Sequence, residues 1–404
     1  MKVIAVYNRY LSRGGEDEVF ESEIALLRSH GCEVHPVEEQ TQRPTTLLAK
    51  ISAAGNCVWS ESWYLKFRAL LAQKRPDVVH VQNCFPAISP SIYYACHKAR
   101  VPVVQTLHNY RLICPAANLY RNGDCEECID HSLWRSVRYG CYQESHLGTA
   151  AVSFMLAAHR MLGTWSRVVD LYTTPTEFAR QAFIRGGLPP DKIRVKPNFV
   201  EPDPGVGSNR GEYVMFAGRL SAEKGVVTLI NAWKILLPTV PLVIIGDGPL
   251  REYVESQLPR SDFPRVEYRG RLSRAETIAA MKSARFLLFP SELYETFGMT
   301  VAESFACGVP VICSGYGAVT ELVKDRVTGL HFEAGNAAHL AKQVDWAWHH
   351  PDEMQAMGAA ARAVYESRLT GPQNYKFLID VYKAAVQSRL FRGRTEHNTS
   401  PVVP

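Results

Sequence analysis

Two carboxylates on either side of a glycine-containing loop suggest a site for a phosphorylated sugar. Glu295 and Glu303 follow the apolar run 286–289, have seven residues between them including Gly298, and lead into an expected helix with Glu303 in its first turn. Such a loop presents backbone N–H groups and the positive end of a helix dipole, which suit phosphate. Because carboxylates do not bind anions, we expect them to accept hydroxyl protons on either side, as a nucleotide sugar would require. Two surface acids favoured by the helix dipole alone remain the alternative.

Two cations after another expected strand could hold the same diphosphate. Arg219 and Lys224 lie five residues apart in the sequence GRLSAEKG, directly after the apolar run 213–217. Arg contributes a rigid fork of donors and Lys a compact charge, and both can converge on one diphosphate. Two exposed basic residues in a turn are the alternative.

The acidic pair and the sequence that follows it resemble the signature of the retaining glycosyltransferases of family 4. The resemblance rests on Glu295, Glu303 and the segment ACGVP at 306–310. It implies that Glu295 meets hydroxyls of the transferred sugar and that Glu303 meets the ribose. It also implies that the loop, through Met299 and Thr300, meets the diphosphate.

The same resemblance implies a reaction and a donor. Arg219 and Lys224 would neutralise the leaving diphosphate of a UDP- or GDP-sugar, so that no catalytic metal is required. A hexosyl group would pass with retention to a hydroxyl of a glycan or lipid-linked acceptor. Asp247 and Arg271 would border the nucleotide, with backbone near Arg271 meeting the base. From its surroundings in GDGP, Asp247 itself is expected to be a turn or capping residue rather than a catalytic acid.

Two candidate positions in the first half also follow expected strands. Gly14 and Gly15 end the loop after residues 2–7, where glycine permits close backbone approach ahead of a helix. They do not form a GxGxxG fingerprint, so dinucleotide binding is not indicated. The resemblance places such a glycine pair at the donor diphosphate or the acceptor site, although a simple loop-to-helix junction explains it equally well. His108 ends the run 103–107, and the resemblance places it beside the transferred sugar, with a structural histidine as the alternative.

The connection 109–145 is unusually long and contains four cysteines. Cys125 and Cys128 form a Cys-x2-Cys pair, and Cys114 and Cys141 flank it. This spacing predicts a structural zinc site that pins a lid near the acceptor, while four unligated thiols are the alternative.

Twelve short apolar runs alternate with helical patterns, six in each half, and predict an α/β fold with parallel, doubly wound sheets. The resemblance implies the GT-B architecture of two Rossmann-like domains facing across a cleft. We expect an acceptor-binding domain at 1–198, a linker at 199–211 and a nucleotide-sugar domain at 212–370. A helix at 371–391 should pack back on the first domain, and 392–404 should form a disordered tail.

Composition fits a soluble cytoplasmic protein without a signal peptide, whose ten cysteines are thiols or metal ligands. The formal net charge of +5 arises entirely in residues 1–198, which hold 23 basic and 18 acidic side chains. A charge of this size excludes a nucleic-acid-binding composition and could favour an anionic acceptor or the inner membrane surface, while a solvated, slightly basic surface is the alternative. The apolar segment 147–162 predicts a buried helix, with a helix lying on a membrane as the alternative.

Two other functions are compatible with these patterns. A nucleotide-sugar epimerase could use the same architecture and would convert its donor without an acceptor. A non-catalytic, zinc-bearing interaction protein would bind no nucleotide.

Overall fold

The computed structural model of the chain describes residues 1–11, 13–41, 45–207, 211–236, 240–258 and 265–398. Contacts divide the chain into two units, which we call the first and second unit. The first unit comprises Met1–Asn118, Glu126–Lys196 and Asn374–Pro404, and the second comprises Leu119–Cys125 and Pro197–Gln373. The short segment Leu119–Cys125 therefore lies in the second unit, although the chain on both sides of it belongs to the first.

A six-stranded parallel sheet forms the centre of the first unit, in the order β2-β1-β3-β4-β5-β6. Each strand corresponds to an apolar run singled out in the sequence. The strands are β1 (Lys2–Arg9), β2 (Glu33–Gln40), β3 (Val78–Asn83), β4 (Val103–Thr106), β5 (Leu171–Thr174) and β6 (Ile193–Val195).

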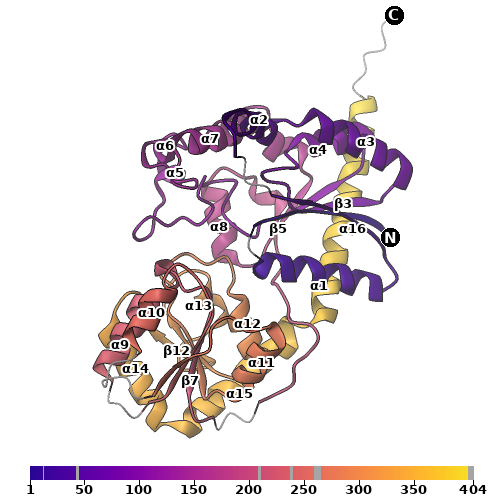
Figure 1. Ribbon diagram of the computed structural model, residues 1–404. Helices are drawn as coiled ribbons and strands as arrows, with labels where there is room; N and C mark the ends of the chain where they lie inside the picture. Colours follow the sequence, from indigo (N-terminus) through magenta and orange to yellow (C-terminus); the bar gives the residue numbers. More distant parts are fainter. Residues whose placement is uncertain (12, 42–44, 208–210, 237–239, 259–264, 399–404) are drawn as a thin grey trace, which may run out of the picture. The chain divides into compact units, whose positions relative to one another are not determined.

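Helices cover both faces of this sheet, with α1 on one side and α2, α4 and α7 on the other (Figure 1). The side chains of β1 alternate between the two faces, so Val3, Ala5 and Tyr7 pack with α1 and α16. The helices are α1 (Gly15–Ser29), α2 (Leu47–Val58), α3 (Glu61–Lys74), α4 (Ser91–Ala99), α5 (Glu127–Asp130), α6 (Arg135–Tyr139), α7 (His146–Met161), the π-helix η1 (Thr164–Val168), α8 (Glu177–Arg185), the 3-10 helix η2 (Pro190–Lys192) and α16 (Gly371–Asn398).

The C-terminal helix α16 returns to the first unit, where Leu378, Val381 and Tyr382 join the core of β1 and α1. It continues to Asn398, so the part of the expected 392–404 tail that the structure describes is helical. Residues 399–404 lie outside the described residues. None of the described helices has the length and apolar content needed to cross a bilayer.

The second unit is also built around a six-stranded parallel sheet, in the order β12-β11-β10-β7-β8-β9. Its strands again match the predicted apolar runs. They are β7 (Val214–Ala217), β8 (Leu242–Ile245), β9 (Val266–Tyr268), β10 (Phe286–Phe289), β11 (Val311–Ser314) and β12 (Gly329–Phe332).

Alternation along β7, β8 and β10 divides the second unit's core into two apolar layers. Met215, Val243 and Leu287 belong to one layer, and their sequence neighbours belong to the other. The first layer packs against α11, α12 and α15, and the second packs against α9 and α14. The helices are η3 (Ala222–Lys224), α9 (Val226–Ile235), α10 (Arg251–Gln257), α11 (Arg274–Lys282), α12 (Met299–Ala306), α13 (Val319–Leu322), α14 (Ala337–His349) and α15 (Pro351–Arg368).

The expected linker at 199–211 belongs to the second unit and packs on it at both ends of the part 199–207 that the structure describes. Phe199 and Val200 are buried, and the Val200 N–H donates to the Leu369 carbonyl. The Gly207 N–H donates to Cys307 O at 2.8 Å, and a Cβ on Gly207 would collide with Lys282 O. Residues 208–210 lie outside the described residues.

Candidate functional site

Close backbone packing shapes the loops after β7 and β8 in the second unit. Gly246 has a φ of +145°, and a Cβ there would lie 1.8 Å from Gly218 O. Gly225 has a φ of +70°, and its Cβ would lie 1.9 Å from Pro290 O. Only glycine fits such approaches, so these two positions hold the β7 loop against the loops after β8 and β10.

The close approach at Gly225 places its neighbour Lys224 beside Glu295. The Lys224 ammonium donates to Glu295 Oε1, and the Ser291 hydroxyl donates to the same oxygen at 2.8 Å. Both charged side chains remain partly accessible, at 28% for Lys224 and 15% for Glu295. The structure thus brings together two residues that the sequence separates by seventy positions.

The loop between the two predicted acids ends at Gly298, which is the N-cap of α12 with a φ of +99°. Phe297 is buried in the core and anchors this loop. The N–H groups of Val301 and Ala302 both donate to the Gly298 carbonyl. Helix geometry leaves the N–H groups of Met299 and Thr300 without an intrahelical acceptor, so both can donate to an anion.

Glu303 lies in the second turn of α12, which corrects the expectation of a first-turn position. The helix begins only at Met299, because Gly298 takes a left-handed conformation and forms the cap. Glu303 is 8% exposed and accepts from Arg274 Nε at 3.0 Å. The Arg274 guanidinium also donates to the Glu201 carbonyl at 3.3 Å. Sequence reasoning missed Arg274, although the helix signature Ser273-x-x-Glu276 placed it at a helix start.

The other predicted residues of the second unit lie in exposed loops. Arg219 follows β7, and Arg271 lies between β9 and α11; both side chains are exposed. Asp247 Oδ1 accepts from the Gly248 N–H at 2.8 Å, and its carbonyl accepts from the Leu220 N–H. Asp247 therefore shapes the turn after β8.

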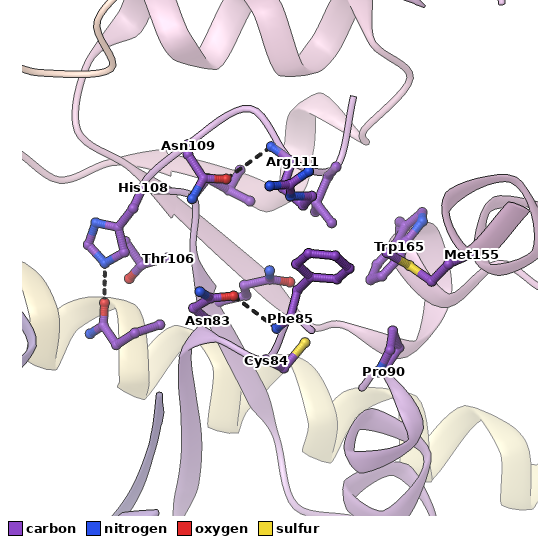
Figure 2. A pocket seen from close by; sticks show the side chains of 14 residues that line it. Asn83, Cys84, Phe85, Pro90, Thr106, His108, Asn109, Arg111, Met155 and Trp165 are labelled. Atoms are coloured by element: carbon purple, nitrogen blue, oxygen red, sulfur yellow. Dashed lines mark hydrogen bonds between the residues drawn. The ribbon is translucent and has the colours of Figure 1, made fainter. Parts of the chain in front are cut away.

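The first unit contains a pocket at the carboxyl ends of β3 and β4. Figure 2 shows His108 and Thr106 on one side of it, Phe85 and Arg111 nearer the middle, and Met155 and Trp165 on the far side. Ends of adjacent parallel strands are the usual ligand position on such sheets. The Arg111 guanidinium lies over the Phe85 ring, 4.7 Å from its centroid.

A buried chain of polar groups supports His108 from behind. His108 Nε2 bonds to Gln82 Oε1, and Gln82 Nε2 donates to Glu23 Oε2 at 2.5 Å. Glu23 also accepts from the Lys196 ammonium. The sequence analysis did not single out Gln82, Glu23 or Lys196. All three are polar residues within apolar strand or helix patterns, and this feature could have indicated a buried polar network.

The hydrogen bonds from Glu23 through Gln82 determine which nitrogen of His108 carries its proton. Because the Gln82 amide donates to a carboxylate, its oxygen must accept, and His108 Nε2 carries the hydrogen. Burial lowers the pKa of His108 to about 3, despite the nearby Glu23 carboxylate. His108 is therefore a neutral imidazole with Nδ1 as its acceptor nitrogen, which suits hydroxyl binding better than proton transfer at neutral pH.

A second buried carboxyl group follows the glycine pair. Glu16 Oε1 accepts from Asn109 Nδ2 at 2.7 Å, while Glu16 Oε2 is buried without a hydrogen-bond partner in the described residues. Burial raises the pKa of Glu16 to about 7, although Asn109 and Arg111 oppose the shift. Gly14 has a negative φ and open space around an added Cβ, so packing does not require glycine there.

The structure does not assemble the predicted four-cysteine zinc site. Among the described residues, which include all four cysteines, no three His, Cys, Asp or Glu side chains are grouped to hold a metal ion. Cys125 belongs to the second unit, whereas Cys114, Cys128 and Cys141 belong to the first. Cys114 is buried and its N–H donates to Tyr110 O within a local turn.

Each unit matches a model of a protein family. Residues 4–198 match the glycosyl transferase 4-like domain, and residues 204–364 match the glycosyl transferases group 1. Solved structures of similar fold have the GT-B architecture. Anabaena HepE in complex with UDP aligns with a TM-score of 0.68 at 18% identity, over 95% of this chain and 100% of that one.

Curated relatives agree with the family models. A GDP-mannose-dependent alpha-mannosyltransferase of Mycolicibacterium smegmatis is 31% identical over 325 residues, which cover 78% of this chain and 76% of the relative. An uncharacterised glycosyltransferase of Methanocaldococcus jannaschii is 34% identical over 138 residues, which cover 34% of this chain but only 38% of the relative. The chain belongs to the glycosyltransferases of group 1, the family-4-like enzymes of GT-B fold.

Proposed function

We propose that this protein transfers a sugar from a nucleoside diphosphate sugar to a hydroxyl of a glycan or lipid-linked acceptor, with retention at the anomeric carbon. The observation that carries the proposal is the Lys224–Glu295 pair. Lys224 ends the 3-10 helix η3 after β7, and Glu295 lies in the loop between β10 and the N–H groups that begin α12. A donor with UDP or GDP as its nucleotide is supported by the UDP complex of HepE and by the GDP-mannose-dependent relative.

On the donor side, the side chains and N–H groups are electrostatically complementary to a departing, negatively charged diphosphate. Lys224 and Arg219 supply positive charge, and the Met299 and Thr300 N–H groups supply aligned dipoles. Glu295 accepts from hydroxyls of the sugar while holding the Lys224 ammonium in place. Glu303, fixed by Arg274, accepts from the ribose hydroxyls.

On the acceptor side, the first unit's pocket binds and orients a hydroxyl. The neutral His108 lies beside the transferred sugar in this proposal, where its acceptor nitrogen orients a sugar hydroxyl, and Asn109 and Arg111 supply polar groups along the wall. The anomeric carbon–oxygen bond to the diphosphate breaks while the acceptor oxygen forms the new bond. The acceptor proton passes to the departing phosphate oxygen, so His108 need not be a base.

Donor turnover with purified protein tests the proposal. UDP- and GDP-hexoses are offered with and without an acceptor, and nucleotide release is measured together with the anomeric configuration of the product. We expect Lys224→Ala and Glu295→Gln each to lower kcat by about 100-fold, as loss of one preorganised charge does. Lys234→Ala at the other end of α9 and Glu353→Gln on α15 are matched controls, since both side chains are exposed.

The possible results separately test the residue roles, the stereochemistry and the reaction class. Near-normal kcat in both Lys224→Ala and Glu295→Gln would refute the assigned roles, and an inverted product would refute retention. Conversion of the donor sugar to its epimer without acceptor would identify a nucleotide-sugar epimerase instead.

A further inference from the structure

Helix α7 is apolar on its exposed side as well as its buried side. Leu147, Phe154 and Met161 recur every seven residues, with alanines at 151 and 158 between them, and so form one stripe along the helix. These three side chains are 83%, 52% and 79% exposed. The expectation of a helix buried on both faces is therefore wrong, because only the opposite stripe, including Val152 and Leu156, is buried.

The neighbouring helix α2 extends this apolar surface. It packs against α7, and His159 near the end of α7 hydrogen-bonds to Val58 O at the end of α2 (Figure 1). Leu48 and Ile51 on α2 are 80% and 60% exposed. We call the exposed side chains of the two helices the apolar ridge: Leu48, Ile51, Leu147, Phe154 and Met161.

The helices that carry and border the apolar ridge have charged side chains of one sign. Helices α2, α6 and α7 contain four Lys or Arg residues and no Asp or Glu. The nearby acids lie outside these three helices: Glu144 is exposed just before α7, and α5 carries the exposed Asp130 and the half-buried Glu127, which pairs with Arg135. The four basic residues are Lys50, Arg135, Arg138 and Arg160, and all four are exposed.

We propose that the apolar ridge is a docking surface for an anionic lipid bilayer. Exposed apolar side chains along one helix face insert at the boundary between headgroups and acyl chains. Basic side chains beside them attract anionic headgroups, and no described helix is suited to cross the bilayer. The positive charge favours this occupant over a second copy of the chain, whose ridge would carry the same charge.

Docking would bring the pocket close to the lipid. Phe154 belongs to the ridge, whereas the next residue, Met155, is buried and lines the pocket with His108 (Figure 2). Only the thickness of α7 therefore separates the outer surface from the pocket wall. Resting on the proposed function, this arrangement lets a lipid-linked acceptor present its hydroxyl to the pocket while its chains stay in the bilayer.

Vesicle flotation tests the docking surface without any substrate. The protein is mixed with phosphatidylcholine vesicles, with or without roughly one third phosphatidylglycerol, at low and high salt. We expect binding to the anionic vesicles, weaker binding to phosphatidylcholine alone and loss of binding at high salt. Because no sugar donor is present, failure here leaves the proposed transferase activity untouched.

Variants separate the ridge from the rest of the surface. Phe154→Ser with Met161→Ser should weaken binding by at least about tenfold, because each side chain contributes buried apolar area. Lys50→Ser with Arg138→Ser should weaken it by roughly fivefold per charge on anionic vesicles only. The matched control Ile235→Ser with Val327→Ser removes two exposed apolar side chains from the second unit and should bind like wild type.

Three results would overturn the proposal. The first is a wild-type protein that floats with neither vesicle. The second is a ridge variant that binds as well as the control while its thermal unfolding is unchanged. The third is a wild-type dimer in sedimentation analysis that the ridge variant converts to a monomer, which would show that a second copy covers the ridge.

Discussion

Lys196 Nζ lies 2.5 Å from Glu23 Oε1, and both side chains are almost fully buried. Lys196 is the last residue of the first unit before the chain enters the second, and its ammonium also reaches Asn374 Oδ1 at 3.5 Å. Asn374 is the first residue after the chain returns. One buried ammonium thus ties two of the crossing points, at Lys196 and Asn374, to α1 and, through Glu23 and Gln82, to His108.

Removing one partner of this pair should be costly. Glu23→Gln or Lys196→Met leaves an uncompensated buried charge, so each should lower the free energy of unfolding by about 3–5 kcal/mol. The double variant Glu23→Leu with Lys196→Met should lose much less than the sum. Urea unfolding measures all three, and Lys2→Met, which breaks the exposed pair with Glu33, should change stability by less than about 1 kcal/mol. Wild-type stability in both buried variants would contradict this account.

Gln82 should determine the tautomer of His108. Gln82→Leu removes the acceptor of the Nε2 hydrogen, so we expect a mixed tautomer in the nitrogen NMR spectrum of His108 and transfer slowed by about tenfold. In the wild type, the low pKa predicts no titration of His108 between pH 5 and 8. Gln73→Leu on exposed α3 is the control. A wild-type His108 that titrates near pH 6.5 would refute the assignment.

Glu16 should make stability decline as the pH rises. Its folded-state pKa of about 7 lies above the ordinary value of 4.5, so the folded state holds the proton more tightly than the unfolded state. The stabilisation is present below pH 4.5 and is lost as the pH rises through 7. Glu16→Gln removes this dependence and should be more stable than wild type at pH 8 by on the order of 2 kcal/mol. Melting temperatures from pH 5 to 8 check it, and parallel curves for both proteins would disprove it.

Gly225 should be essential for both folding and the donor site. Gly225→Ala places a Cβ against the Pro290 carbonyl and strains a left-handed backbone, so we expect a loss of about 2–4 kcal/mol. Nucleotide affinity should also fall, because Lys224 would move away from Glu295. Gly14→Ala, which has a negative φ and open space, should keep wild-type stability and serves as the control. Calorimetry with UDP and GDP measures the affinity, and an unaffected Gly225→Ala would count against the geometry.

The fold could be predicted from the sequence because each strand is indicated by the residues of its own short segment. The inner strands of the two sheets are short apolar runs bounded by polar or turn residues, as parallel sheets buried on both faces require, whereas the edge strands β2, β6 and β9 are more polar and partly exposed. Glu295 and Lys224 could be singled out for the same reason, since each lies in the segment that follows one of these runs.

The features of the candidate site that the sequence did not predict depend on contacts between residues far apart in the chain. Arg274 meets Glu303 and Lys196 meets Glu23 only after the helices pack, and no local pattern pairs them. The cysteine prediction was wrong for a related reason, because spacing along the chain did not reveal that Cys125 belongs to the other unit. The position of Glu303 depended on a single left-handed glycine that delays the start of α12.

The excursion of Leu119–Cys125 means that the polypeptide passes from one unit to the other four times rather than twice. No single cut can therefore yield two complete halves. A fragment beginning at Pro197 would carry all of α16, whose part from Asn374 onward belongs to the first unit, and would lack Leu119–Cys125 of the second unit. Protease cleavage at one exposed loop should accordingly leave two fragments that stay associated, because each fragment contains part of a unit that the other completes.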